Sequence, residues 1–383
     1  MIMDKVIYIH IGTTKTGTSS IQNFLYLNRA VLAKKGYCFK RMPIIRYEQA
    51  DRNRNGMFLG AHRRLFLVGP IPMKIRDKIL NMGLKQVRTW LKQYPAVILT
   101  DESLWNSFQR TDFRNLKRIK ALADENGVGL KLVVYFRPQE DWLESTYRQG
   151  IKKCKSGKNR PEWKEYVKHP EIWPKTDYYE GLCRLSEVVG KDNIIVRVYD
   201  RKEFPEGKVE NDFLQAIGLE PTEEYKFSAE EKNTSLSPNY IEIKRILNNL
   251  EGVGKITHKD LIYGQTATEA CSRNLRKSSK ETFMSADERA MIRDLYEEGN
   301  KKILKEYLTD KKELFPDPKD TPVWSKDNPD LYEDTILLFG YMLLDQEIEI
   351  NRLKRTVYLR LKFIDKCKAL FDKMVKLFMR ETP

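Results

Sequence analysis

The fold is decided by residues 6–22, which read Val6-Ile-Tyr-Ile-His-Ile-Gly-Thr-Thr-Lys-Thr-Gly-Thr-Ser-Ser-Ile-Gln22. The apolar, β-branched run 6–11 predicts a buried strand, and the apolar spacing over 19–35 predicts a helix that stops at Gly36. The loop between them is rich in Gly, Thr and Lys. Backbone N–H groups at the start of a helix lack intrahelical partners and lie at the positive end of the helix dipole. The stretch therefore predicts an anion-binding loop.

The loop differs from a nucleoside-triphosphate loop in the position of its lysine. In that motif the lysine directly follows the second glycine. Here Thr18 follows Gly17, and Lys15 lies inside the loop. A lysine in the middle of the loop points at the end of the bound group that leaves or is transferred. An ordinary turn between strand and helix, with a solvated lysine, is the alternative explanation.

Composition predicts a globular protein with a large core, because the 383 residues are 41% hydrophobic and 32% charged. No apolar run is long enough to predict a membrane-spanning helix, and the N-terminal residues lack the pattern of a signal peptide. The five cysteines are scattered without a CxxC motif, which favours a reducing cytoplasm and argues against a zinc site. We therefore expect a cytoplasmic protein without a bound metal.

The net charge of +15 fits an anionic ligand, an anionic polymer or a membrane surface, and also a solvated lysine-rich surface. No nucleic-acid-binding module is recognisable, so nucleic acid is not an expected partner.

The pattern along the chain alternates between strands and helices. Further strands are expected at 95–100, 130–136 and 193–199, and helices at 75–91, 113–123, 140–153 and 178–189. Such alternation predicts an α/β fold with a doubly wound, mainly parallel sheet and flanking helices. After Asp200 the pattern is helical, with helices expected at 212–217, 238–250 and 286–307.

We predict three consecutive segments: a domain over 1–310, a Pro- and charge-rich linker or arm over 311–332, and a basic amphipathic helical extension over 333–383, broken at Gly340. From residue 351 onward the chain has ten Lys or Arg and three Asp or Glu, with apolar residues at steps of three and four. This helix packs on the domain, pairs with another subunit or contacts an anionic membrane surface through 351–380. The sequence leaves these alternatives and the oligomeric state open.

Three polar segments follow separate strands: loop 12–20, the pair Asp101 and Glu102, and Arg137. Parallel strands bring their carboxyl ends to one edge of the sheet, so we expect the three segments to meet around one ligand. The guanidinium of Arg137 suits a phosphate, and the hydroxyl of Ser145, eight residues on, can complete the contact.

Together these residues resemble the sulfotransferase family that uses 3′-phosphoadenosine-5′-phosphosulfate (PAPS), which has a P-loop-like fold. Residues 10–22 are similar to the family's 5′-phosphosulfate loop with its internal lysine, and 137–152 are similar to its 3′-phosphate segment. Residues 195–218 and 232–237 resemble parts of the bacterial carbohydrate-type members. The resemblance covers the predicted domain and excludes the helical extension.

The resemblance implies an enzyme that moves a sulfuryl group from PAPS to a hydroxyl or amine acceptor, leaving adenosine 3′,5′-bisphosphate. A glycan or glycolipid is the favoured acceptor. The residues implied in binding the 5′-phosphosulfate are Thr14, Lys15, Thr16, Gly17, Thr18 and Ser19. Lys15 would contact the bridging oxygen, and Arg137 with Ser145 would hold the 3′-phosphate. No metal is needed if Lys15 and the loop amides supply the positive charge.

The acceptor must lose a proton as it attacks, so the site needs a base. Glu102 is the first candidate, Asp101 is the second, and His62 in an arginine-rich segment is an alternative. His10 precedes the loop on a buried strand, where we expect it to pack or to form a structural hydrogen bond.

A kinase or nucleotide hydrolase that uses ATP and magnesium is the competing enzyme class. Residues 97–102 resemble the apolar strand plus acid that holds magnesium in such proteins, but the position of Lys15 argues against this class. A non-enzymatic scaffold with a degenerate loop is a further alternative, disfavoured by the joint presence of Lys15, Arg137 and Ser145.

Overall fold

The computed structural model of the chain describes residues 5–43, 53–60, 72–152, 161–173, 176–228, 237–249, 281–318 and 320–378. The chain forms two compact units. Unit 1 comprises Met1–Tyr147, Trp163–Lys232 and Met284–Asp320, and unit 2 comprises Arg148–Glu162, Asn233–Phe283 and Thr321–Pro383. The predicted functional division into 1–310, 311–332 and 333–383 stays a prediction.

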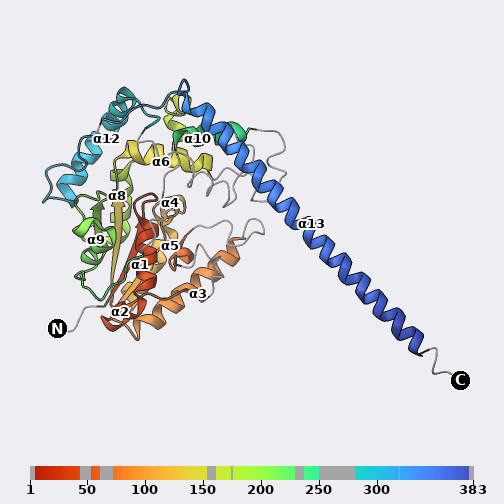
Figure 1. Cartoon of the computed structure of the whole chain (residues 1–383). Coiled ribbons are helices and arrows are strands. Elements are labelled where there is room, and N and C mark those ends of the chain that lie inside the picture. The colour runs from red at the N-terminus through yellow and green to blue at the C-terminus, as the bar shows by residue number, and fades with distance from the viewer. Residues whose placement is uncertain are drawn as a thin grey trace. The chain divides into compact units, whose positions relative to one another are not determined.

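Unit 1 is built on a five-stranded sheet in the order β2-β3-β1-β4-β5, surrounded by helices (Figure 1). The strands are β1 (Val6–Gly12), β2 (Tyr37–Cys38), β3 (Ala96–Thr100), β4 (Gly129–Phe136) and β5 (Ile194–Val198). Every neighbouring pair is parallel, and β1 lies in the centre between β3 and β4. This confirms the α/β fold class and the four strands that the sequence predicts.

Both faces of the sheet are covered by helices, as the continuous apolar strands require. The helices of the described residues, not all of which contact the sheet, are α1 (Thr18–Leu27), α2 (Arg29–Lys34), α3 (Met73–Leu91), α4 (Leu104–Arg110), α5 (Arg114–Glu125), α6 (Gln139–Lys152), α7 (Trp163–Tyr166), α8 (Tyr178–Val189), α9 (Val209–Ala216), α10 (Pro238–Leu247), α12 (Ala286–Tyr307) and α13 (Asp330–Phe378). Short 3-10 turns are η2 (Met57–Leu59), η3 (Pro170–Ile172), η4 (Lys191–Asn193) and η5 (Pro205–Gly207).

Strand β1 divides its side chains between two cores. Ile7, Ile9 and Ile11 pack with α3, α4, α5 and α8. Val6 and Tyr8 point to the opposite face and pack with α1 and α9. The alternation follows from the two-residue repeat of a strand, and it places the loop after β1 at the carboxyl edge of the sheet with helices on both sides.

The structure corrects the expected single helix 19–35, which is two helices separated at Asn28. The Asn28 amide nitrogen donates to the carbonyl oxygens of Phe24 and Lys226, and its amide oxygen accepts from the Lys226 N–H. This contact with a distant segment ends α1. Gly36 ends α2 as predicted and has a φ of +88°. Strand β2 and helix α4 were not predicted, because two and seven residues are too few to show a clear period.

Unit 2 contains α10 and the 49-residue helix α13. Leu338 of α13 packs on Tyr240, Ile243 and Leu247 of α10. The predicted break at Gly340 is wrong, since α13 continues through it as one long helix (Figure 1). A Cβ at Gly340 would meet nothing within 4 Å, so the glycine costs only helix propensity there. None of the described helices combines the length and the apolarity that crossing a bilayer requires.

Candidate functional site

The loop between β1 and α1 is anchored by buried hydrogen bonds. The Thr13 N–H and hydroxyl both donate to the Tyr135 carbonyl of β4, at 3.1 and 3.0 Å. The Thr16 hydroxyl donates to the Thr13 carbonyl at 2.6 Å, and the Trp142 indole N–H donates to the Thr14 carbonyl at 2.8 Å. Carbonyl oxygens of the loop therefore face protein donors. Because the Thr16 side chain is buried and its hydroxyl donates to Thr13, only the backbone N–H of Thr16 is left for a ligand.

Three residues of the loop have positive φ: Gly12 at +111°, Lys15 at +70° and Gly17 at +71°. A Cβ at Gly12 would lie 2.7 Å from the Glu102 carbonyl oxygen, so the loop touches the segment after β3. Lys15 adopts the left-handed conformation without being glycine, which costs about 1–2 kcal/mol. Such local strain is typical of a functional position, and Lys15 is exposed at this point.

The N-terminus of α1 presents free backbone donors. Gly17 is its N-cap and has no side-chain capping bond, and the first turn has no acidic residue. The first intrahelical bond runs from the Ile21 N–H to the Gly17 carbonyl. The amides of Thr18, Ser19 and Ser20 therefore precede it, at the positive end of the helix dipole. The side chain of Ser19 is exposed there and that of Thr18 is buried.

Arg137 reaches this loop from the end of β4. Its Nη1 donates to the Lys15 carbonyl at 3.4 Å, and its Nη2 lies 3.3 Å from a carboxylate oxygen of Asp141. Tyr178 donates its hydroxyl to the Arg137 carbonyl, which fixes the backbone. The Nε of Arg137 is buried and has no hydrogen-bond partner in the described part of the chain. An orphaned guanidinium N–H suits an anionic ligand.

Ser145 lies further along α6 and is half-buried. Helical spacing places it on the same side of α6 as Trp142, one turn beyond the contact with Thr14. Within the described residues, Ser145 forms no hydrogen bond with Arg137 or with the loop. The structure therefore brings Lys15 and Arg137 together directly and leaves Ser145 one helical turn away from the nearest loop contact.

The two acids after β3 have different surroundings. Asp101 is fully buried, and its Oδ1 accepts from the N–H and hydroxyl of Ser103 at 2.8 and 2.7 Å and from Arg54 at 2.9 Å. It holds the turn that leads into α4. Glu102 is 27% exposed, and its Oε2 accepts from the Gln22 amide at 2.8 Å, with the Arg54 Nε at 3.4 Å. Glu102 is thus the accessible carboxylate, held against α1.

Of the histidines considered, His62 lies outside the described residues, as do Arg52, Arg63 and Arg64. His10 is fully buried, with its Nδ1 2.9 Å from the Thr100 hydroxyl and its ring packed edge-on against Tyr135 and Phe213. Burial lowers the pKa of His10 from 6.5 to about 3. The prediction of a structural role for His10 is confirmed.

The contacts of three contributors to the site were not predicted from the sequence, although Arg54 belongs to the arginine-rich segment that could contact the acceptor. Gln22 orients Glu102, Arg54 pairs with both acids, and Trp142 binds the loop. Only Trp142 carried a local signal, since a buried indole N–H needs an acceptor. Among the described residues, no group of three His, Cys, Asp or Glu side chains has the geometry of a metal site.

No protein-family model matches the chain. A protein of Archaeoglobus fulgidus, called only an uncharacterized protein, is 34% identical over 186 residues. The match spans 48% of this chain and about half (47%) of that relative. A crystal structure of a sulfotransferase from Alicyclobacillus acidocaldarius is 13% identical, with 65% of this chain and 95% of that chain covered and a TM-score of 0.33. Likeness at this level carries no argument about function.

Proposed function

We propose that the chain is a sulfotransferase that moves a sulfuryl group from PAPS to a hydroxyl or amine acceptor. The observation that carries the proposal is that two residues with cationic side chains, from different strand ends, come together at a helix N-terminus. Lys15 lies in the loop after β1, and Arg137 follows β4 and donates to the Lys15 carbonyl. A donor with a sulfated 5′-phosphate and a separate 3′-phosphate requires two such cationic positions.

The residues present fit that donor. The amides of Thr18, Ser19 and Ser20 have no intrahelical partner and would bind the 5′-phosphosulfate, with the exposed Lys15 beside them. The orphaned Nε of Arg137 is available for the 3′-phosphate. In this assignment Ser145 completes the 3′-phosphate contact once a ligand lies between α6 and the loop.

Different residues would stabilise the leaving group and accept the proton during the transfer. The bond between sulfur and the bridging oxygen breaks, and its electron pair stays on the leaving phosphate oxygen. Lys15 and the amides at the start of α1 stabilise the charge that develops there. A new bond forms between sulfur and the acceptor atom, whose proton passes to the Glu102 carboxylate.

Glu102 suits the base because it is accessible and oriented by Gln22 and Arg54. Asp101 suits it less, since its Oδ1 already accepts from three donors and its side chain is fully buried. The same contacts weaken the magnesium-dependent kinase alternative, in which this acid would bind the metal. His62 stays an alternative base.

The test is sulfate transfer from labelled PAPS into a panel of hydroxyl acceptors, with glycans and glycolipids included. Lys15→Ala should lower the rate by about 10²- to 10³-fold, because it removes charge stabilisation in the transition state. Lys34→Ala is the matched control, since Lys34 is an exposed lysine of α2. Binding of ATP that requires magnesium, without binding of adenosine 3′,5′-bisphosphate, would contradict the proposal.

We also propose that α13 places the enzyme at an anionic membrane surface on the cytoplasmic side. Its apolar side chains Leu353, Val357, Leu361, Ile364 and Phe371 are about half exposed or more, and basic residues fill much of the remaining surface. In a flotation assay, the wild type should rise with vesicles that contain anionic lipid, and Ile364→Glu should not. Neither protein should rise with neutral vesicles. A doubled mass in solution without flotation would instead show that the helix pairs with a second copy.

A further inference from the structure

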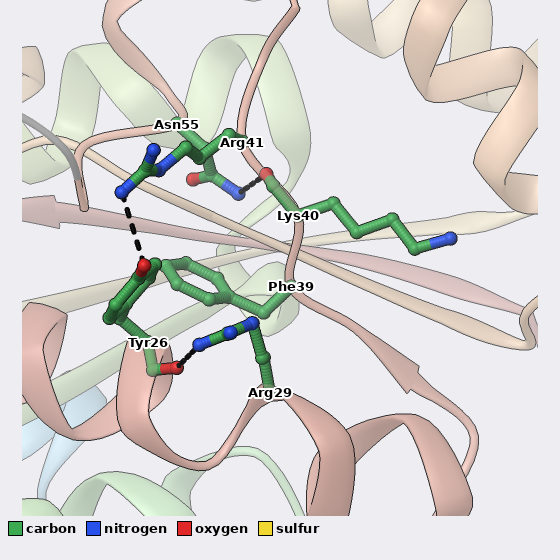
Figure 2. A pocket seen from close by; sticks show the side chains of 6 residues that line it. All are labelled: Tyr26, Arg29, Phe39, Lys40, Arg41 and Asn55. Carbon is green, nitrogen blue, oxygen red and sulfur yellow. Dashed lines mark hydrogen bonds between the residues drawn. The ribbon is translucent and has the colours of Figure 1, made fainter. Parts of the chain in front are cut away.

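A basic pocket of about 290 Å³ lies beside the C-terminal end of α1 in unit 1 (Figure 2). Tyr26 comes from α1, Arg29 begins α2, and the segment after strand β2 follows. The lining residues are Tyr26, Arg29, Phe39, Lys40, Arg41 and Asn55. The lining therefore includes two guanidinium side chains and one phenol. The Lys40 ammonium lies 4.8 Å from the centre of the Tyr94 ring, and Figure 2 shows this side chain pointing away from Tyr26, Arg29 and Arg41.

The basic side chains of the lining have no carboxylate partner among the described residues. In the part of the chain that the structure describes, neither Arg29, Lys40 nor Arg41 forms an ion pair with a carboxylate. The Arg29 and Arg41 guanidinium carbons lie 4.5 and 5.1 Å from the centre of the Tyr26 ring. Figure 2 shows both guanidinium groups beside Tyr26. Within the described residues, the two guanidinium groups thus concentrate positive charge around a hollow whose lining has no carboxylate.

The lining is held in place by hydrogen bonds. Arg29 donates to the Tyr26 carbonyl at 2.8 Å, and Arg41 donates to the Tyr26 hydroxyl at 3.2 Å. The buried amide of Asn55 donates to the Lys40 and Ile98 carbonyls and accepts from the Thr100 N–H. The pocket is therefore fastened to the end of β3, which reduces the ordering cost of binding.

The same elements connect the pocket to Glu102. Gln22, which donates to Glu102, and Tyr26 are four residues apart on α1 and so lie on one face, about 6 Å apart along the helix axis. Arg54, the neighbour of Asn55, lies 3.4 Å from a Glu102 oxygen. A group that extends from the pocket along this face of α1 would consequently approach the carboxylate that we assign as the base.

We propose that this pocket is the acceptor subsite and that it selects a saccharide carrying a carboxylate or sulfate beside the reacting hydroxyl. This inference rests on the proposed function. Guanidinium groups recognise both anions through paired hydrogen bonds. The volume is at the lower end of the range for small-ligand sites, so the pocket takes one sugar-sized unit, and Glu102 faces the hydroxyl of its neighbour.

The first test measures binding without turnover. Calorimetry with a glucuronate-containing disaccharide compares the wild type with the double variant Arg29→Gln/Arg41→Gln, and Arg110→Gln on α4 is the matched control. We expect the double variant to bind at least about tenfold more weakly and the control to bind as the wild type does. Equal affinity of the double variant and the wild type would overturn the subsite, and thermal unfolding checks that both variants fold.

The second test separates this inference from the proposed function. Transfer from labelled PAPS is measured into the same disaccharide and into its carboxyl-reduced, neutral form. In Arg41→Gln, KM should rise for the anionic acceptor alone, with kcat and the Kd of adenosine 3′,5′-bisphosphate unchanged. Equal increases in KM for the anionic and the neutral acceptor would overturn the proposed subsite and would leave the proposed function standing. Failure to bind adenosine 3′,5′-bisphosphate at all overturns the proposed function, and the calorimetry still decides the pocket.

Discussion

The two ends of α1 are suited to anions by different means. At its N-terminus the donors are backbone amides, and the loop before them is held by buried hydrogen bonds of Thr13 and Thr16. At its C-terminus the donors are the long side chains of Arg29 and Arg41 beside a hollow of about 290 Å³. A backbone site depends on the path of the chain, whereas a side-chain site depends on charge.

This difference predicts how each end responds to perturbation. Only a substitution by proline deletes a backbone donor, but backbone donors are displaced when a neighbouring residue cannot adopt the required φ. Exposed cations can be deleted singly, and salt screens them within about 10 Å at 0.1 M ionic strength. Substitutions that change the backbone conformation should therefore weaken anion binding at the N-terminus of α1. Removal of a charge or addition of salt should weaken anion binding at its C-terminus.

The largest expected effect concerns Glu102, which lies between the two ends. Glu102→Gln keeps the shape of the side chain and removes the proton acceptor. We expect transfer to slow by about 10²- to 10⁴-fold, while the Kd of adenosine 3′,5′-bisphosphate stays unchanged. Single-turnover rates with labelled PAPS measure the effect. Near-normal turnover would move the base to His62 or Asp101.

Gly17→Ala tests the backbone end. A Cβ there would lie 2.8 Å from the Tyr199 ring and 3.1 Å from a Val209 methyl, in a residue with a φ of +71°. We expect a loss of about 1–3 kcal/mol in the free energy of unfolding and weaker binding of adenosine 3′,5′-bisphosphate.

Gly127→Ala is the matched control for this substitution. Gly127 also has a positive φ, +60°, but a Cβ there would meet nothing within 4 Å. It should therefore show the cost of the backbone conformation without the crowding, and it should leave nucleotide binding intact. If both variants lose the same stability and the same binding, the close fit of Gly17 has no role.

Salt distinguishes the two ends more finely. Raising the ionic strength from 0.05 to 0.5 M (concentrations chosen for the test) should raise the KM of an anionic acceptor several-fold more than it raises the KM of its neutral form. The Kd of adenosine 3′,5′-bisphosphate should be measured in the same buffers. If the KM of the neutral acceptor depended on salt as strongly as the KM of the anionic acceptor, the proposed charge-based recognition at the C-terminus of α1 would be wrong.

The last expected effect is an acid sensitivity of the backbone end, through the buried His10. Its folded-state pKa is about 3 against an ordinary 6.5, so the unfolded chain binds the extra proton between these values. The stability contribution is complete above pH 6.5 and falls as the pH drops toward 3, by at most about 1.4 kcal/mol per pH unit.

His10→Gln should flatten this part of the pH dependence while keeping a hydrogen-bonding group near Thr100. Urea unfolding of both proteins between pH 4 and 8 (a range chosen to bracket the transition) measures the slope. Above pH 7 the free energies of unfolding of the two proteins should change with pH in parallel. Identical slopes below pH 6 would show that His10 is protonated in the folded protein.

The sequence alone determined the parallel sheet and the loop after its first strand. The continuous apolar runs of β1, β3 and β4 can be recognised in the sequence without tertiary information. The helices between them are recognised by the three- and four-residue spacing of their apolar residues. Lys15 was recognisable as a special residue from its spacing to Gly12 and Gly17. Arg137 could be placed near it because parallel strands end at one edge.

Only the tertiary structure decided how neighbouring residues divide their work. Asp101 and Glu102 are adjacent in sequence, yet contacts from Ser103, Gln22 and Arg54 make one structural and leave the other accessible. The break at Asn28 depends on Lys226, and the basic pocket is assembled from three separate segments. Such features arise from residues far apart in the chain, whose contacts have no local period, whereas the strand, loop and helix at residues 6–27 are encoded by their own spacing.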